Sequence, residues 1–130
     1  MSPNELVKVY TSLVRPTVEY ACQVWHAGLT KGQTEMLESI QERVLKLIYP
    51  DLDYNQALAE SRLDTLHERR EKLSQNLFVE AQNTQHKLFP LMPPLRESSS
   101  TRDTYPYAIP FVHTNRFRDT FINHGLNSRW

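Results

Sequence analysis

The chain is poor in cysteine and glycine and has no excess of charge of either sign. A single cysteine, Cys22, excludes a secreted scaffold held by internal disulfides. The three glycines, Gly28, Gly32 and Gly125, lie too far apart to form a glycine-rich phosphate loop. Fifteen Lys and Arg residues balance fifteen Asp and Glu residues, which excludes a strongly basic nucleic-acid-binding domain and an acidic tail. A weak or local nucleic-acid surface stays open.

Long apolar runs are also missing from the 130 residues. No stretch approaches the roughly 18 consecutive apolar residues of a transmembrane helix. The N-terminal segment carries Glu5 and Lys8, where a signal peptide needs an apolar run. We therefore expect an intracellular protein, cytoplasmic or nuclear, with no membrane partner and a single modest core.

Apolar residues recur at helical spacing over the first two thirds of the chain, which predicts an all-α fold. Helices are expected over residues 3–24, 31–49, 54–61 and 66–82, with a kink at Pro16. Short loops between them favour a three- to four-helix bundle. The N-caps are predicted at Ser2, Thr30, Asp53 and Thr65. The predicted buried stripes include Leu13, Tyr20 and Val24 on the first helix and Met36, Leu37, Ile40, Val44, Leu47 and Ile48 on the second.

The amino-acid composition changes near residue 90, where prolines cluster. We expect a helical domain over residues 1–90 and, over 91–130, a Pro/Ser-rich linker followed by an arm that contains aromatic residues and arginines. Two prolines make residues 105–112 extended, and Thr114 begins a short terminal helix. The aromatic residues of the arm have two interpretations: they dock the arm on the helices, or, with Arg116 and Arg118, they stack bases and contact phosphates.

Catalytic and metal-binding patterns are not evident. Cys22 and His26 have the spacing of half a zinc site or of a nucleophile pair, but no second Cys/His pair follows and no oxyanion-hole pattern is present. Asp51 and Asp53 are explained by turn and helix-cap roles. We predict no catalytic residue, no metal site and no small-molecule substrate.

Four segments of the chain carry a recognisable pattern, and the first is Tyr10 with SLVRPTVEYACQVW (12–25). It resembles the phrase Tyr-x-Ser-Leu-Val-x-Pro-x-x-Glu-Tyr-Ala-x-x-x-Trp, which is typical of the C-terminal region of reverse transcriptases from non-LTR (LINE-type, jockey-like) retrotransposons. The segments LESIQERVLKLI (37–48), LDTLHERR (63–70) and TNRFRDTFI (114–122) resemble its Leu-Glu-x-Ile-Gln-x-Arg, Leu-x-x-Leu-x-x-Arg-Arg and Thr-x-Arg-x-x-x-x-Phe-Ile phrases. The resemblance is collinear over nearly the whole chain, although Asn123 stands where the family usually continues with proline.

The resemblance implies a fragment of an RNA-directed DNA polymerase, from around and after its thumb, which helps to hold template and primer. The family's catalytic palm and its Tyr-x-Asp-Asp hairpin are absent from this sequence, so the chain alone is expected to be non-catalytic and to hold no cofactor. Mg²⁺ would belong only to an intact polymerase with its palm. By analogy with a thumb, the candidate phosphate-binding residues are Arg43, Lys46, Arg69 and Arg70, to which the arm adds Arg116 and Arg118.

A second hypothesis belongs to another class of protein. Neutral charge and amphipathic helices without a site are also typical of a helical protein-interaction module, from a domesticated or orphan reading frame, that self-associates. RNA or DNA binding that falls steeply with salt favours the first hypothesis, and salt-insensitive self-association favours the second.

Overall fold

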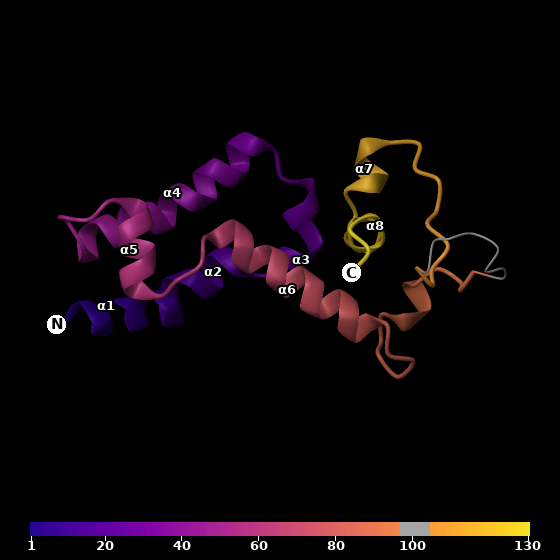
Figure 1. Ribbon diagram of the computed structural model, residues 1–130, viewed down its shortest axis with the longest axis horizontal. Coiled ribbons are helices and arrows are strands. Elements are labelled where there is room, and N and C mark those ends of the chain that lie inside the picture. The colour runs from indigo at the N-terminus through magenta and orange to yellow at the C-terminus, as the bar shows by residue number, and fades with distance from the viewer. Residues whose placement is uncertain (97–104) are drawn as a thin grey trace. The chain divides into compact units, whose positions relative to one another are not determined.

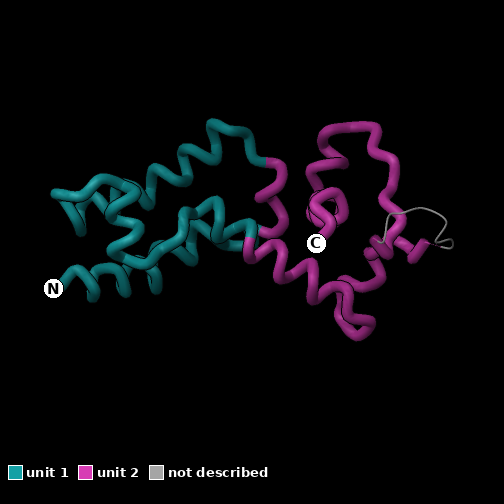
Figure 2. The backbone as a smooth tube through the Cα atoms, in the orientation of Figure 1, with its two compact units in different colours: residues 1–22, 29–71 teal, residues 23–28, 72–130 magenta. Residues whose placement is uncertain are grey.

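The computed structural model describes residues 1–96 and 105–130, which are helical and contain no strand (Figure 1). The predicted all-α class is therefore confirmed. The chain divides into two compact units, shown in Figure 2: unit 1 comprises residues 1–22 and 29–71, and unit 2 comprises residues 23–28 and 72–130. The domain boundary predicted near residue 90 stays a prediction, and the Ser-rich part of the predicted linker lies outside the described residues.

Unit 1 is built from helices whose starts follow local capping signals. Its elements are α1 (Pro3–Val9), η1 (Tyr10–Val14), α2 (Arg15–Glu19), α4 (Lys31–Ile48), α5 (Tyr54–Ser61) and the first part of α6 (Leu66–Ala81). Ser2, Thr30 and Asp53 each form a capping box with the residue three positions later. Thr65 and Glu68 exchange the same pair of bonds before α6, at 3.2 Å each. The four predicted caps are confirmed.

The first predicted helix is interrupted twice. Pro16 lies near the start of α2, directly after the π-helical turn η1, in which the Arg15 N–H donates to the Tyr10 carbonyl oxygen. A wider turn makes room for the proline ring, which would clash with the preceding turn of a regular α-helix. The helix then breaks at Tyr20 and Ala21, where Ala21 has a φ of 50°. The segment that follows is short, comprising α3 (Cys22–Trp25) and the 3₁₀ turn η2 (His26–Gly28).

The predicted buried stripes are wrong at several positions. Tyr20 is 81% exposed, Met36 is 71% exposed and Leu47 is 81% exposed. The exposed group also contains Leu13, Val24 and Ile40. The π-helical turn and the break at Ala21 shift the helical phase, so apolar spacing no longer marks one face. On α4 the inward face is centred on Gln41 and Leu45, both fully buried, and a polar residue in that row hides the face from apolar periodicity.

Unit 2 has its own aromatic core. Phe78 of α6, Tyr107 and Leu126 are buried together, and partly buried residues pack around them. These surrounding residues are Met92, Tyr105, Ile109, Phe121, Ile122 and Trp130. The Phe78 ring meets the rings of Phe121 and Trp130 edge to face, with centroids 6.1 and 5.9 Å apart. Most aromatic residues of the arm therefore dock it on a helix, which was one of the two sequence interpretations.

The arm reaches this core as an extended segment and ends in two short helices. Residues 94–96 and 106–108 pair through an isolated antiparallel bridge between Leu95 and Tyr107. The helices are α7 (Asn115–Arg118), capped by Thr114 as predicted, and α8 (Phe121–Asn127). A 3₁₀ turn, η3 (Phe89–Leu91), lies between α6 and the bridge. None of the helices in the described ranges is long and apolar enough to cross a membrane.

We expect Gly125→Ala to destabilise unit 2, because a Cβ atom at this buried position would overlap the Phe78 ring. The cost of such overpacking is about 1–3 kcal/mol, measured by urea unfolding followed by circular dichroism. Gly32→Ala is the matched control, since a Cβ there meets nothing within 4 Å and alanine favours the helix. A Gly125→Ala protein as stable as Gly32→Ala would contradict this packing.

Candidate functional site

A buried polar network links the helices of unit 1, and it is centred on Gln41. The Tyr10 hydroxyl donates to Gln41 Oε1 at 2.9 Å. Gln41 Nε2 donates to the Tyr54 hydroxyl at 3.2 Å and to the Asp64 carbonyl oxygen at 3.0 Å. A buried amide must be hydrogen-bonded to offset its lost hydration. This one side chain therefore fixes η1, α4, α5 and the turn before α6 against one another.

Glu38 lies on α4, one turn before Gln41, and its side chain caps the start of α6. Its carboxylate accepts from the Leu66 N–H at 3.1 Å and the His67 N–H at 3.3 Å, and also from the Tyr54 hydroxyl. The first N–H groups of a helix lack intrahelical partners and carry partial positive charge. A carboxylate at that point stabilises the start of α6 and sets its position relative to α4.

Charged side chains extend this network. Arg69 Nε lies 2.6 Å from Glu19 Oε1, and Arg15 Nε lies 3.7 Å from the same oxygen. Arg70 is fully buried. Burial lowers the pKa of its guanidinium from the ordinary value, while the carboxylates of Glu38 and Glu19 act in the opposite direction. Two carboxylates thus lie within electrostatic range of a cation that folding has removed from water.

Burial also shifts the pKa values of Tyr10 and Cys22 in this unit. The pKa of Tyr10 is raised to about 12, and burial is the largest cause. It also raises the pKa of the Cys22 thiol, which is fully buried. A thiol with a raised pKa stays protonated at neutral pH and is a poor nucleophile and metal ligand. These properties favour the interpretation of Cys22 as a small core residue.

The six candidate phosphate-binding residues are divided between the two units, four in unit 1 and two in unit 2. Arg69 is committed to Glu19, and the buried Arg70 has no exposed surface for a phosphate in this fold. Both belong to the structural network of unit 1. The sequence of α6 does not reveal which face of that helix meets α4, and the phosphate-binding role of these two residues stays a prediction.

Arg43 and Lys46 are exposed and border a groove of about 510 Å³ between α4 and α5. Lys46 Nζ donates to the Pro50 carbonyl oxygen at 3.0 Å. Leu45, Leu52, Tyr54 and Ala57 also line this groove, and so do the carboxylates of Glu42 and Asp53. Two cations beside two carboxylates give the groove no net charge for attracting a phosphate.

Arg116 and Arg118 are exposed on α7 in unit 2. Arg118 Nε lies 3.4 Å from Asp119 Oδ1 in a solvent-exposed pair. Such a pair contributes little and is screened by salt, so it leaves Arg118 able to contact an anion. Of the six candidates, these two lie outside unit 1, and both are accessible to solvent.

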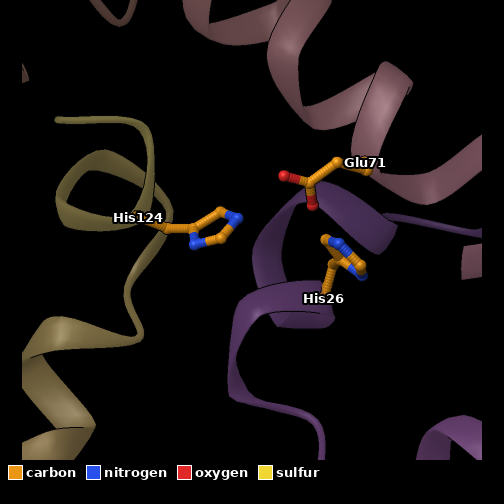
Figure 3. A group of neighbouring side chains, drawn as sticks. All are labelled: His26, Glu71 and His124. Carbon is orange, nitrogen blue, oxygen red and sulfur yellow. The ribbon is translucent and has the colours of Figure 1, made fainter. Parts of the chain in front are cut away.

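The structure brings together two histidines that sequence spacing did not connect. His26 and His124 both belong to unit 2, and their ring centroids lie 6.1 Å apart with the planes nearly perpendicular (Figure 3). The His124 ring also meets Trp130 edge to face at 5.0 Å. Two imidazoles supply half of the four ligands of a closed zinc site. Glu71 belongs to the other unit, and the absence of a metal stays a prediction.

Comparison with protein-family models, with curated proteins and with solved structures finds no match to this chain. What the chain does is therefore inferred from its own residues and their contacts.

We expect Glu38→Gln to destabilise unit 1 by about 1–3 kcal/mol, because an amide cannot accept hydrogen bonds through both of its terminal atoms. The loss of negative charge at the start of α6 adds to this cost. Urea unfolding measures the change. Glu42→Gln is the matched control, one turn further along α4 on the exposed side, and it should change stability by no more than about 0.5 kcal/mol. Equal effects of the two substitutions would refute the capping role of Glu38.

Proposed function

We propose that this chain is a helical part of a non-LTR retrotransposon reverse transcriptase, downstream of its palm, that supports nucleic acid and performs no catalysis itself. The proposal is supported by contacts between residues of the segments that resemble this family. Tyr10 and Glu19 of the first segment contact Gln41 of the second and Arg69 of the third. Residues separated widely in the sequence are thus partners in a single network.

The contacts between the second and third segments support the same proposal. Glu38 receives hydrogen bonds from the first N–H groups of α6, and Gln41 donates to the carbonyl oxygen of Asp64. Leu66, in the same segment, is fully buried. Polar residues of these segments that hydrogen-bond to one another indicate a structural role rather than a catalytic one. The resemblance therefore concerns a structural region of the polymerase.

A helical protein-interaction module is the second candidate, and a specific observation favours it. Unit 1 exposes several large apolar side chains, namely Leu13, Tyr20, Met36 and Leu47. Exposed apolar side chains mark a surface that another protein covers where they are contiguous, so these four residues are the candidates for such a surface. Light scattering distinguishes this role, because burial of apolar surface predicts a mass that rises with concentration and hardly changes with salt.

The proposed origin is tested by reading the native transcript upstream of Met1. We expect an open frame, continuous with this chain, that encodes a palm with a Tyr-x-Asp-Asp motif. The purified 130-residue chain should not extend a primer with dNTPs and Mg²⁺, whereas the product of the whole frame should. An unrelated upstream frame, or primer extension by the short chain alone, would contradict the proposal.

A further inference from the structure

The neutral composition of the chain conceals opposite charges on its two units. Unit 1 contains eight Lys and Arg residues against eleven Asp and Glu residues, a net charge of −3. Unit 2 contains seven against four, a net charge of +3. An anionic polymer is attracted to the positive unit and repelled by the negative one. The charge distribution therefore directs the nucleic-acid surface to unit 2 and away from the groove beside Arg43 and Lys46.

One aromatic side chain of unit 2 is far more exposed than the rest. Phe111 is 79% exposed, against 46% for Phe117. The ring of His113 meets it edge to face, with centroids 4.7 Å apart, and Pro110 fixes the backbone just before it. An aromatic ring held by a neighbour but open to solvent is prepared for stacking, since little side-chain freedom is lost on contact. The packing of unit 2 does not explain why so large an apolar side chain is exposed.

A guanidinium group lies beside this ring, in an exposed pair with Asp119. Phe111 and Arg118 line the same groove, which has a volume of about 510 Å³, together with Ile109, Pro110, Val112, Asp119, His124 and Asn127. This volume is within the range of about 300–1,000 Å³ that is typical of ligand sites. Arg116 is exposed on the same short helix as Arg118. A ring for a base and the guanidinium group of Arg118 thus border one groove, and Arg116 adds a second cation on the same helix.

We propose that unit 2 binds a single strand of RNA or DNA by stacking a base on Phe111 and by holding backbone phosphates with Arg116 and Arg118. This inference rests on the proposed nucleic-acid-supporting function and names the surface that performs it. A single strand is favoured because a base must be unstacked from its neighbours to lie on a protein ring. Stacking tolerates any base, so sequence preference should be weak.

The experiment measures fluorescence anisotropy of labelled oligo(U)₁₂, oligo(dT)₁₂ and a 12-base-pair duplex with the full chain. Phe111→Leu removes the ring but keeps an apolar side chain, and Phe111→Tyr keeps the ring. We expect Phe111→Leu to weaken single-strand binding about 5- to 150-fold and Phe111→Tyr to leave it unchanged. The duplex should bind more weakly than both single strands.

A second pair of variants locates the phosphate contacts. Arg116→Gln/Arg118→Gln should weaken binding and reduce the slope of log affinity against log salt by about 1.4, the expectation for two single-strand phosphate contacts. Arg43→Gln/Lys46→Gln removes the same charge from unit 1 and should change neither quantity. Thermal unfolding of each variant establishes that the substituted protein is folded, which these exposed positions should permit.

The inference would be overturned by wild-type affinity in Phe111→Leu, by a duplex that binds better than the single strands, or by no measurable binding of the wild-type chain. Loss of binding in Arg43→Gln/Lys46→Gln with none in the α7 pair would also overturn it, while leaving nucleic-acid support by unit 1 in place. The proposed reverse-transcriptase origin fails separately, through the upstream reading frame.

Discussion

The hydrogen bonding of one buried amide, Gln41, is the constraint on which the rest of unit 1 depends. Its oxygen accepts from Tyr10, and its nitrogen donates to Tyr54 and to the Asp64 carbonyl oxygen. An unsatisfied buried amide would cost about 1–3 kcal/mol, so these partners must be in place together. Apolar packing brings helices into contact without fixing their positions, whereas this amide defines the register of α4 against its neighbours.

The positions of the charged residues follow from that register. With α4 fixed, Glu38 meets the first N–H groups of α6, and α6 then places Arg69 beside Glu19 and buries Arg70. Arg69 and Arg70, which the sequence suggests as phosphate ligands, therefore take part in the structural network. The proposed nucleic-acid contact therefore uses Arg116 and Arg118, which are exposed in the positive unit 2.

Local signals in the sequence predicted the all-α class and the helix starts, because a cap depends on residues three positions apart. They did not predict which faces are buried. Met36 and Leu47 follow apolar spacing yet are exposed, since the inward row of α4 contains polar residues whose partners lie 13 to 31 positions away. The opposite charges of the units, the pairing of His26 with His124 and the exposure of Phe111 depend on long-range folding in the same way.

A double-mutant cycle between Tyr10 and Gln41 tests the network most directly. Tyr10→Phe removes the hydroxyl, Gln41→Ala removes the amide, and urea unfolding gives the stability of the wild type, both single variants and the double variant. The account predicts that the two losses are not additive, with a coupling free energy of about 0.5–3 kcal/mol, as for residues in contact. Additive losses would mean that the two side chains act independently and would contradict the claim that Gln41 organises unit 1.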